Sequence, residues 1–148
     1  MKDIKKILVP IDFTAHSEKI VESAALVAGK FEALLEVVFV VETLEGYAGF
    51  AVPHISLDNL EKDLINRAQN KMEDFINDFP HKNISFNGKV LYGKVAEQIV
   101  NHAEAEGCDL IVIGTQTCRG LEKMIFGSVT EKVIKSAACP VLTLNPCI

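Results

Sequence analysis

The stretch Asp109-Leu110-Ile111-Val112-Ile113-Gly114 decides the fold class, because an unbroken run of branched apolar residues is typical of a strand buried on both faces. Four further strands are predicted, at residues 5–11, 34–41, 84–91 and 141–144. Between the strands, apolar residues recur at helical spacing over residues 15–31, 57–79, 94–106 and 128–137. Strands that alternate with helices need crossover connections. The sequence therefore predicts an α/β protein with one five-stranded parallel sheet and helices on both faces.

Local signals indicate where the helices begin and end. Thr14 is the candidate N-cap of the first helix, and Glu18 places a negative charge in its first turn. Gly107 is expected to end the third helix, and Ser128 to cap the fourth. Residues 43–55 show no clear period and are expected to form a surface loop.

Composition and charge exclude several function classes. The formal net charge of the 148-residue chain is −5, and no basic block is present, so nucleic-acid binding is disfavoured as the main role. No run approaches the ~20 apolar residues of a membrane span, and no signal-peptide pattern is visible, so we expect a cytoplasmic protein. The four cysteines form no Cys-x-x-Cys pair and are expected to be reduced thiols. The histidines lack zinc-ligand spacing, so no metal site is predicted.

The segment from Gly114 to Thr130 links the fourth strand to the fourth helix and is the candidate anion site. Its glycines at 114, 120 and 127 allow close approach of the backbone. The start of the helix offers free amides and the positive end of its dipole, and Ser128 adds a hydroxyl. These features fit a phosphate cradle, and they fit equally well a flexible loop before an ordinary capped helix.

Over nearly its whole length the chain resembles the universal stress protein family. The motifs that carry the resemblance are Ile7-Leu8-Val9-Pro10-Ile11-Asp12, then residues 108–115, then Gly127-Ser128-Val129-Thr130, and finally Cys139-Pro140-Val141-Leu142. The resemblance implies a single universal stress protein domain over residues 1–148. It also implies an adenine nucleotide alpha hydrolase-like fold, a doubly wound sheet with strand order 3-2-1-4-5. In such sheets ligands bind at the carboxyl ends of the strands.

The ATP-binding branch of this family resembles Gly-x-x-Gly, nine residues, then Gly-Ser or Gly-Thr. Gly114, Gly127 and Ser128 match this pattern with the spacing intact, whereas Thr117 replaces the second glycine. A β-branched residue resists a left-handed backbone at a cost of about 1–2 kcal/mol. The Thr117 hydroxyl is also able to donate to a phosphate.

The resemblance implies ATP or AMP as the ligand, with or without Mg²⁺. Asp12 would hold the ribose side, Pro10 would fix the backbone beneath the base, and Val40 would contact adenine. The nucleotide-binding residues so predicted are Pro10, Ile11, Asp12, Val40, Gly114, Thr115, Thr117, Gly127, Ser128 and Val129. The alternatives are a helix-capping role for Asp12 and a core position for Val40. No catalytic residue is predicted, since no P-loop or nucleophile motif is present.

Residues 140–145 begin with Pro140, end with Asn145, and would lie at a sheet edge open to pairing. Family members commonly dimerise through this strand, so the resemblance implies a homodimer. The alternative is a sheet edge that is protected only by its short length. The favoured hypothesis is a cytoplasmic homodimer that binds ATP or AMP in the stress response, with the ligand regulatory or structural and hydrolysis at most slow. A nucleotide-free dimerisation and adapter module, favoured by Thr117, is the alternative. An enzyme of a nucleotide-binding α/β class is the least favoured hypothesis.

Overall fold

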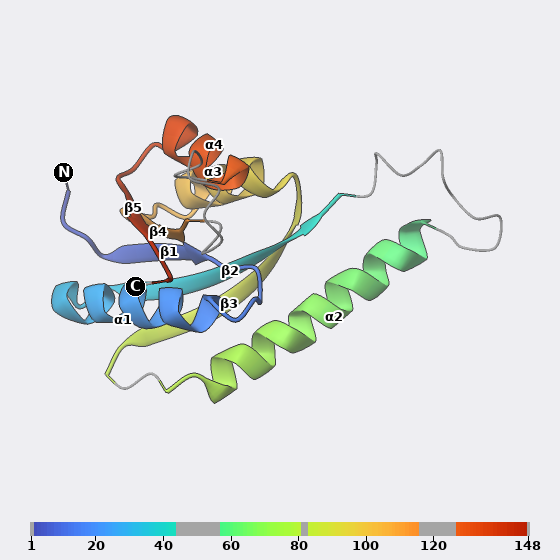
Figure 1. Ribbon diagram of the computed structural model, residues 1–148, viewed down its shortest axis with the longest axis horizontal. Helices are drawn as coiled ribbons and strands as arrows, with labels where there is room; N and C mark the ends of the chain where they lie inside the picture. The colour runs from blue at the N-terminus through green and yellow to red at the C-terminus, as the bar shows by residue number, and fades with distance from the viewer. Residues whose placement is uncertain (1, 44–56, 81–82, 116–126, 148) are drawn as a thin grey trace.

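A parallel sheet of five strands, in the order β3-β2-β1-β4-β5, runs through the part of the chain that the structure describes (Figure 1). The computed structural model describes residues 2–43, 57–80, 83–115 and 127–147. The strands are β1 (Lys6–Pro10), β2 (Leu34–Glu42), β3 (Ser85–Gly93), β4 (Leu110–Gly114) and β5 (Val141–Leu144). The helices are α1 (Ser17–Phe31), α2 (Leu57–Asp78), α3 (Val95–Ala105) and α4 (Ser128–Ser136). The predicted doubly wound α/β sheet of order 3-2-1-4-5 is confirmed.

The burial of apolar side chains explains the central place of β1 and β4. Ile7, Leu8 and Val9 of β1 are fully buried, as are Ile111 and Val112 of β4. A strand covered on both faces has no polar side, which produces the unbroken apolar runs of the sequence. By contrast, β3 lies at the edge of the sheet, and its first half alternates between exposed and half-buried side chains.

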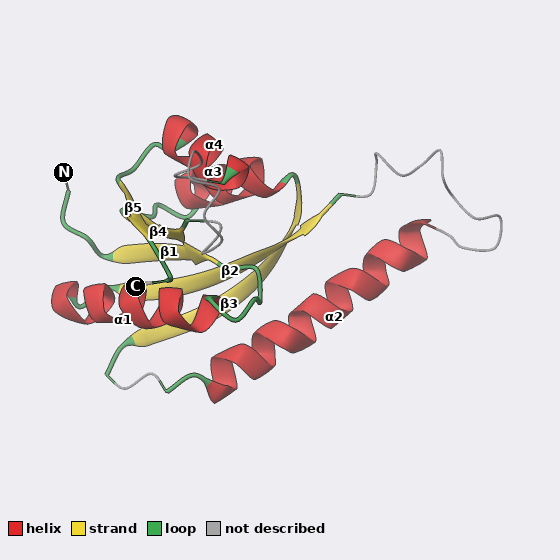
Figure 2. Ribbon diagram, viewed as in Figure 1, coloured by secondary structure: helices red, strands yellow, loops and turns green. Residues whose placement is uncertain are grey.

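Two helices cover each face of the sheet: α1 and α2 lie on one side, and α3 and α4 lie on the other (Figure 2). Because successive strand residues point to opposite faces, Ile7 and Val9 belong to the core under α1 and α2, whereas Leu8 belongs to the core under α3 and α4. β1 pairs with β2 on one side and with β4 on the other, so the strand order reverses at β1. Such a reversal opens a crevice at the carboxyl ends of the strands.

Two predicted helix caps are wrong. The N-cap of α1 is His16, not Thr14, because the Thr14 hydroxyl already donates to Asp12 Oδ1 at 2.6 Å within the preceding turn. The N-cap of α4 is Gly127, which has no capping side chain, and Ser128 is the first helical residue. The predicted end of α3 is confirmed, since Gly107 adopts a left-handed backbone (φ 65°) just beyond it.

The cysteines differ from one another in state. Cys147 is disulfide-bonded, so the prediction of a reduced thiol is wrong at this position. Cys108 and Cys139 are free. Burial raises the pKa of the Cys108 thiol to about 11, so it stays protonated at neutral pH.

Within the described ranges, no helix has the length and apolar character needed to cross a membrane. Most of the loop predicted over residues 43–55 lies outside the described residues.

Candidate functional site

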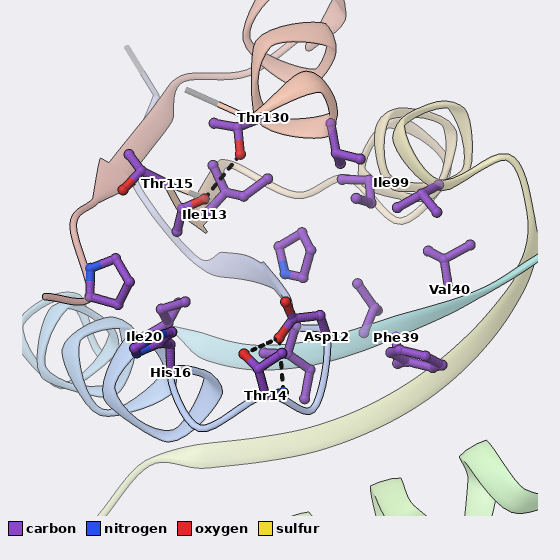
Figure 3. Close-up of a pocket in the computed structure, with 18 of the residues that line it drawn as sticks. Asp12, Thr14, His16, Ile20, Phe39, Val40, Ile99, Ile113, Thr115 and Thr130 are labelled. Atoms are coloured by element: carbon purple, nitrogen blue, oxygen red, sulfur yellow. Dashed lines mark hydrogen bonds between the residues drawn. The ribbon is translucent and has the colours of Figure 1, made fainter. Parts of the chain in front are cut away.

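A pocket of about 390 Å³ opens at the carboxyl ends of β1, β2 and β4 (Figure 3). Its walls also include residues from the starts of α1 and α4 and from α3. The pocket thus occupies the place where the strand order reverses, which is where open α/β sheets bind ligands.

The structure brings together eight of the ten predicted site residues in this pocket. They are Pro10, Ile11, Asp12, Val40, Gly114, Thr115, Gly127 and Val129. Ser128 is exposed and does not line the pocket, so its side chain does not face the others. Thr117 lies outside the described residues.

Asp12 is held by the turn that follows it. Its Oδ1 accepts hydrogen bonds from the Thr14 amide (3.0 Å), the Thr14 hydroxyl (2.6 Å) and the Ser17 hydroxyl (3.1 Å). Burial raises the pKa of the Asp12 carboxyl, but these hydrogen bonds outweigh burial and hold the pKa below its ordinary value. Asp12 is therefore ionised at neutral pH, and the three hydrogen bonds that it accepts from Thr14 and Ser17 all fall on Oδ1. The two interpretations of Asp12, as a local cap and as a ligand contact, are compatible.

The turn after Asp12 is strained in a way that the sequence does not reveal. Phe13 has φ 59°, a left-handed backbone that bulky side chains rarely adopt. Its ring packs on Phe39 with centroids 4.6 Å apart, and on Phe75 edge-on at 6.3 Å. These contacts in the core under α1 and α2 hold the strained residue in place and so direct the neighbouring carboxylate toward the pocket.

One wall of the pocket is apolar, and the wall opposite it carries both apolar and polar groups. β2 and α3 contribute an apolar wall made of Val38, Phe39, Val40, Val95 and Ile99. Opposite this wall lie the end of β4 and the first turn of α4. The lining residues that the structure describes include no Lys or Arg. The donors that they offer to an anion are therefore His16, hydroxyl groups and the backbone amides in the first turn of α4.

Sequence reasoning missed several lining residues, among them Thr130 and Glu42. Thr130 carried a signal, because it lies within the motif that starts at Gly127 and follows Ser128 by two positions. Glu42 ends β2, and only the spatial course of that strand places it at the rim. Among the described residues, no group of three His, Cys, Asp or Glu side chains is arranged to hold a metal ion.

Comparison with known proteins identifies the class to which this fold and pocket belong. The family model described as the universal stress protein family matches residues 3–145. The universal stress protein MJ0531 of Methanocaldococcus jannaschii is 32% identical over 143 residues, which cover 95% of this chain and 82% of that protein. The chain therefore belongs to the universal stress protein family.

Structures of other family members have the same fold. Universal stress protein UspA from Lactobacillus plantarum superimposes with a TM-score of 0.77 at 22% identity, over 97% of this chain and 99% of that one. A universal stress protein from Archaeoglobus fulgidus in complex with dAMP gives a TM-score of 0.67 at 20% identity, with 96% and 98% covered. Another universal stress protein, in complex with cAMP, gives 0.61 at 16% identity, with 98% and 99% covered.

Proposed function

We propose that the pocket binds an adenine nucleotide, ATP or AMP. The observation that carries the proposal is the division of the pocket around Asp12, with an apolar wall on one side and a helix N-terminus on the other. A nucleotide has the matching division into a flat base, a ribose with two hydroxyls and an anionic phosphate. The family membership of the chain, and the dAMP and cAMP complexes of two family members, support the proposal.

Each part of the nucleotide has a complementary group in the pocket. The base would lie against Val40 and the apolar wall, where burial of a flat ring is favourable. The ribose hydroxyls would donate to Oδ2 of Asp12, whose other oxygen is already occupied by Thr14 and Ser17. The phosphate would accept hydrogen bonds from the backbone amides of residues 128–130 at the start of α4. Any Mg²⁺ would accompany the phosphates of ATP.

The chain would act as a single domain over residues 1–148, with the nucleotide as a regulatory or structural ligand that is turned over slowly if at all. We also propose a homodimer through residues 140–145. In support, β5 is an edge strand, and Leu142 on it is partly exposed although apolar. Location in the cytoplasm completes the proposal. Because disulfides are rare in the cytoplasm, the disulfide at Cys147 is the observation that stands against this part of the proposal. Thiol labelling of cell extracts quenched in acid tests it: a reduced Cys147 supports the cytoplasm, and an oxidised Cys147 contradicts it.

Calorimetric titration with AMP and with ATP, each with and without Mg²⁺, tests the central proposal. We expect saturable binding of both by the wild-type chain and a loss of affinity in Asp12→Asn. Asp109→Asn is the matched control, because Asp109 also accepts hydrogen bonds from backbone amides, those of Lys5 and Lys6, but does not line the pocket. A folded wild-type chain that binds neither nucleotide at millimolar concentration would refute the proposal.

A second candidate function is a nucleotide-free adapter module. Thr117 favours it, because this residue stands where the ATP-binding pattern has a glycine. The two functions differ in what Thr117→Gly does. Under the first, the variant binds AMP about as tightly as the wild type. Under the second, the wild type binds no AMP, and a gain of binding in the variant would show that the native loop prevents it.

A further inference from the structure

We propose that Thr130 is a positioning residue, which fixes the first turn of α4 so that the backbone amides of residues 128–130 face the phosphate half of the pocket. This inference rests on the proposed function, because it assigns a task within the same site. Thr130 lines the pocket, yet its hydroxyl makes its hydrogen bond to the protein backbone.

The Thr130 side chain forms an unusual link for its place in a helix. It is the third residue of α4, where a polar side chain often bonds to the N-cap of its own helix. Here the hydroxyl donates instead to the carbonyl oxygen of Gly114, the last residue of β4, at 3.0 Å (Figure 3). Thr130 is only 3% exposed, so water does not readily replace this bond.

This hydrogen bond is well placed to set the direction of α4. The helix packs chiefly against α3, and within the described ranges the Thr130 bond is the hydrogen bond that joins α4 to the sheet. The first bond inside the helix runs from the Glu131 amide to the Gly127 carbonyl, at 2.9 Å. The amides before Glu131 therefore point out of the helix end, and their direction follows that of the first turn.

The acceptor of the Thr130 bond is itself fixed from two sides. A side chain at Gly114 would collide with Ile20 of α1, which fills that space. The next amide, that of Thr115, donates to the Leu144 carbonyl of β5 at 2.7 Å. Gly114 thus ends β4 in a defined position, and Thr130 transfers that position to the helix whose amides would hold the phosphate.

Titration with AMP and with adenosine, followed by the backbone amide signals in NMR, tests the inference. Thr130→Val keeps the shape of the side chain and removes the donor, while Thr130→Ser keeps the donor. We expect Thr130→Val to weaken AMP binding about five- to tenfold, the usual effect of one hydrogen bond. Adenosine binding should change less than about twofold, and Thr130→Ser should bind AMP like the wild type. Thr143→Val, the same change in β5 outside the pocket, is the control.

The outcomes separate this inference from the proposed function. A wild-type chain that binds neither ligand refutes both. A wild type that binds AMP while Thr130→Val binds it equally well overturns the inference and leaves the proposed function standing. Two further outcomes in Thr130→Val also overturn the inference. One is an equal loss of affinity for AMP and for adenosine, and the other is an equal reduction of the AMP-induced amide shifts at Asp12 and at residues 128–130. Either would indicate a general loss of structure, which has no preference for the phosphate.

Discussion

The two ends of the parallel sheet differ in how their carboxylates are paired. At the amino ends, the Glu36 carboxylate is 1% exposed and is surrounded by basic side chains: His102 on one oxygen, and Lys6 at 3.5 Å and Lys89 at 3.9 Å on the other. At the carboxyl ends, the Asp12 carboxylate accepts hydrogen bonds from neutral groups on Oδ1. Within the described residues, the first backbone bond of α4 begins only at the Glu131 amide.

This difference separates stability from binding. A charge enclosed by its partners has no capacity left for a ligand, and its removal leaves buried groups uncompensated. A carboxylate with one oxygen unused, beside a helix N-terminus, retains that capacity. Substitution of the Asp12 carboxylate in the pocket should therefore cost mainly binding, and substitution of Glu36 or its partners at the amino ends should cost mainly stability.

Removal of Glu36 should have the largest effect. Glu36→Ala leaves His102 and Lys6 beside a buried cavity and is expected to cost about 3–5 kcal/mol of unfolding free energy. Urea denaturation measures this loss. The matched control is Glu131→Ala, whose exposed partner Lys135 should make little difference. The double variant Glu36→Leu, His102→Leu should recover part of the loss, and a Glu36→Ala chain as stable as the wild type would remove the contrast between the two ends.

A side chain at Gly114 should give the second largest effect. In Gly114→Ala the new Cβ meets the Ile20 side chain, and overpacking of this kind costs about 1–3 kcal/mol. Thermal unfolding of Gly114→Ala and of the double variant with Ile20→Val measures the cost. The double variant should be the more stable of the two, because the valine frees the space. If Ile20→Val gives no relief, the glycine is needed for some other reason.

Much of the fold could be predicted from the sequence, because burial is repeated along each element. The apolar run at residues 110–113 and the helical spacing over residues 15–31 both reflect contact with the sheet, and both elements formed within a few residues of the prediction. The exact start of α1 could not be predicted, since Thr14 has two partners to choose between. In the structure the Thr14 hydroxyl donates to Asp12 Oδ1 within the turn, and the helix begins three residues after Thr14, at Ser17.

Long-range polar pairs limited the prediction of the site. The pocket residues from Pro10 to Val129 were found through a family motif, and motif spacing reflects backbone geometry. The bond from Thr130 to Gly114 and the pairing of Glu36 with His102 join elements far apart in the chain. A charged residue inside the apolar run of β2 signals a buried partner, but nothing local says which residue it is.

At the amino end of the sheet, the buried Cys108 thiol should make the free energy of unfolding depend on pH in the alkaline range. Burial raises the pKa of Cys108 from 9.0 to about 11, the nearby Lys6 ammonium opposing this shift and the Glu36 carboxylate adding to it. Between these two pH values the unfolded chain loses a proton that the folded chain keeps, so stability falls as pH rises. The unfolding free energy of Cys108→Ala should therefore fall less steeply over this pH range than that of the wild type, and the difference should reach about 1–2 kcal/mol. Urea denaturation at pH 8, 9, 10 and 11 checks this, with Cys139→Ala as the more exposed control.

At the carboxyl end, acid pH should reveal the smallest effect. Burial raises the Asp12 pKa, but the hydrogen bonds from Thr14 and Ser17 lower it by more, so the folded chain releases this proton more readily than the unfolded chain. Asp12 therefore contributes stability above its unfolded pKa, and that contribution is lost as pH falls through the folded pKa. Because the group is partly solvated, the contribution should be well below about 1 kcal/mol. Asp12→Asn should unfold in acid with a slightly shallower pH dependence than the wild type, whereas bound AMP should steepen that dependence in the wild type alone. An acid slope that AMP changes equally in both chains would show that the carboxylate takes no part in binding, and the contrast with Glu36 would then rest on the helix amides alone.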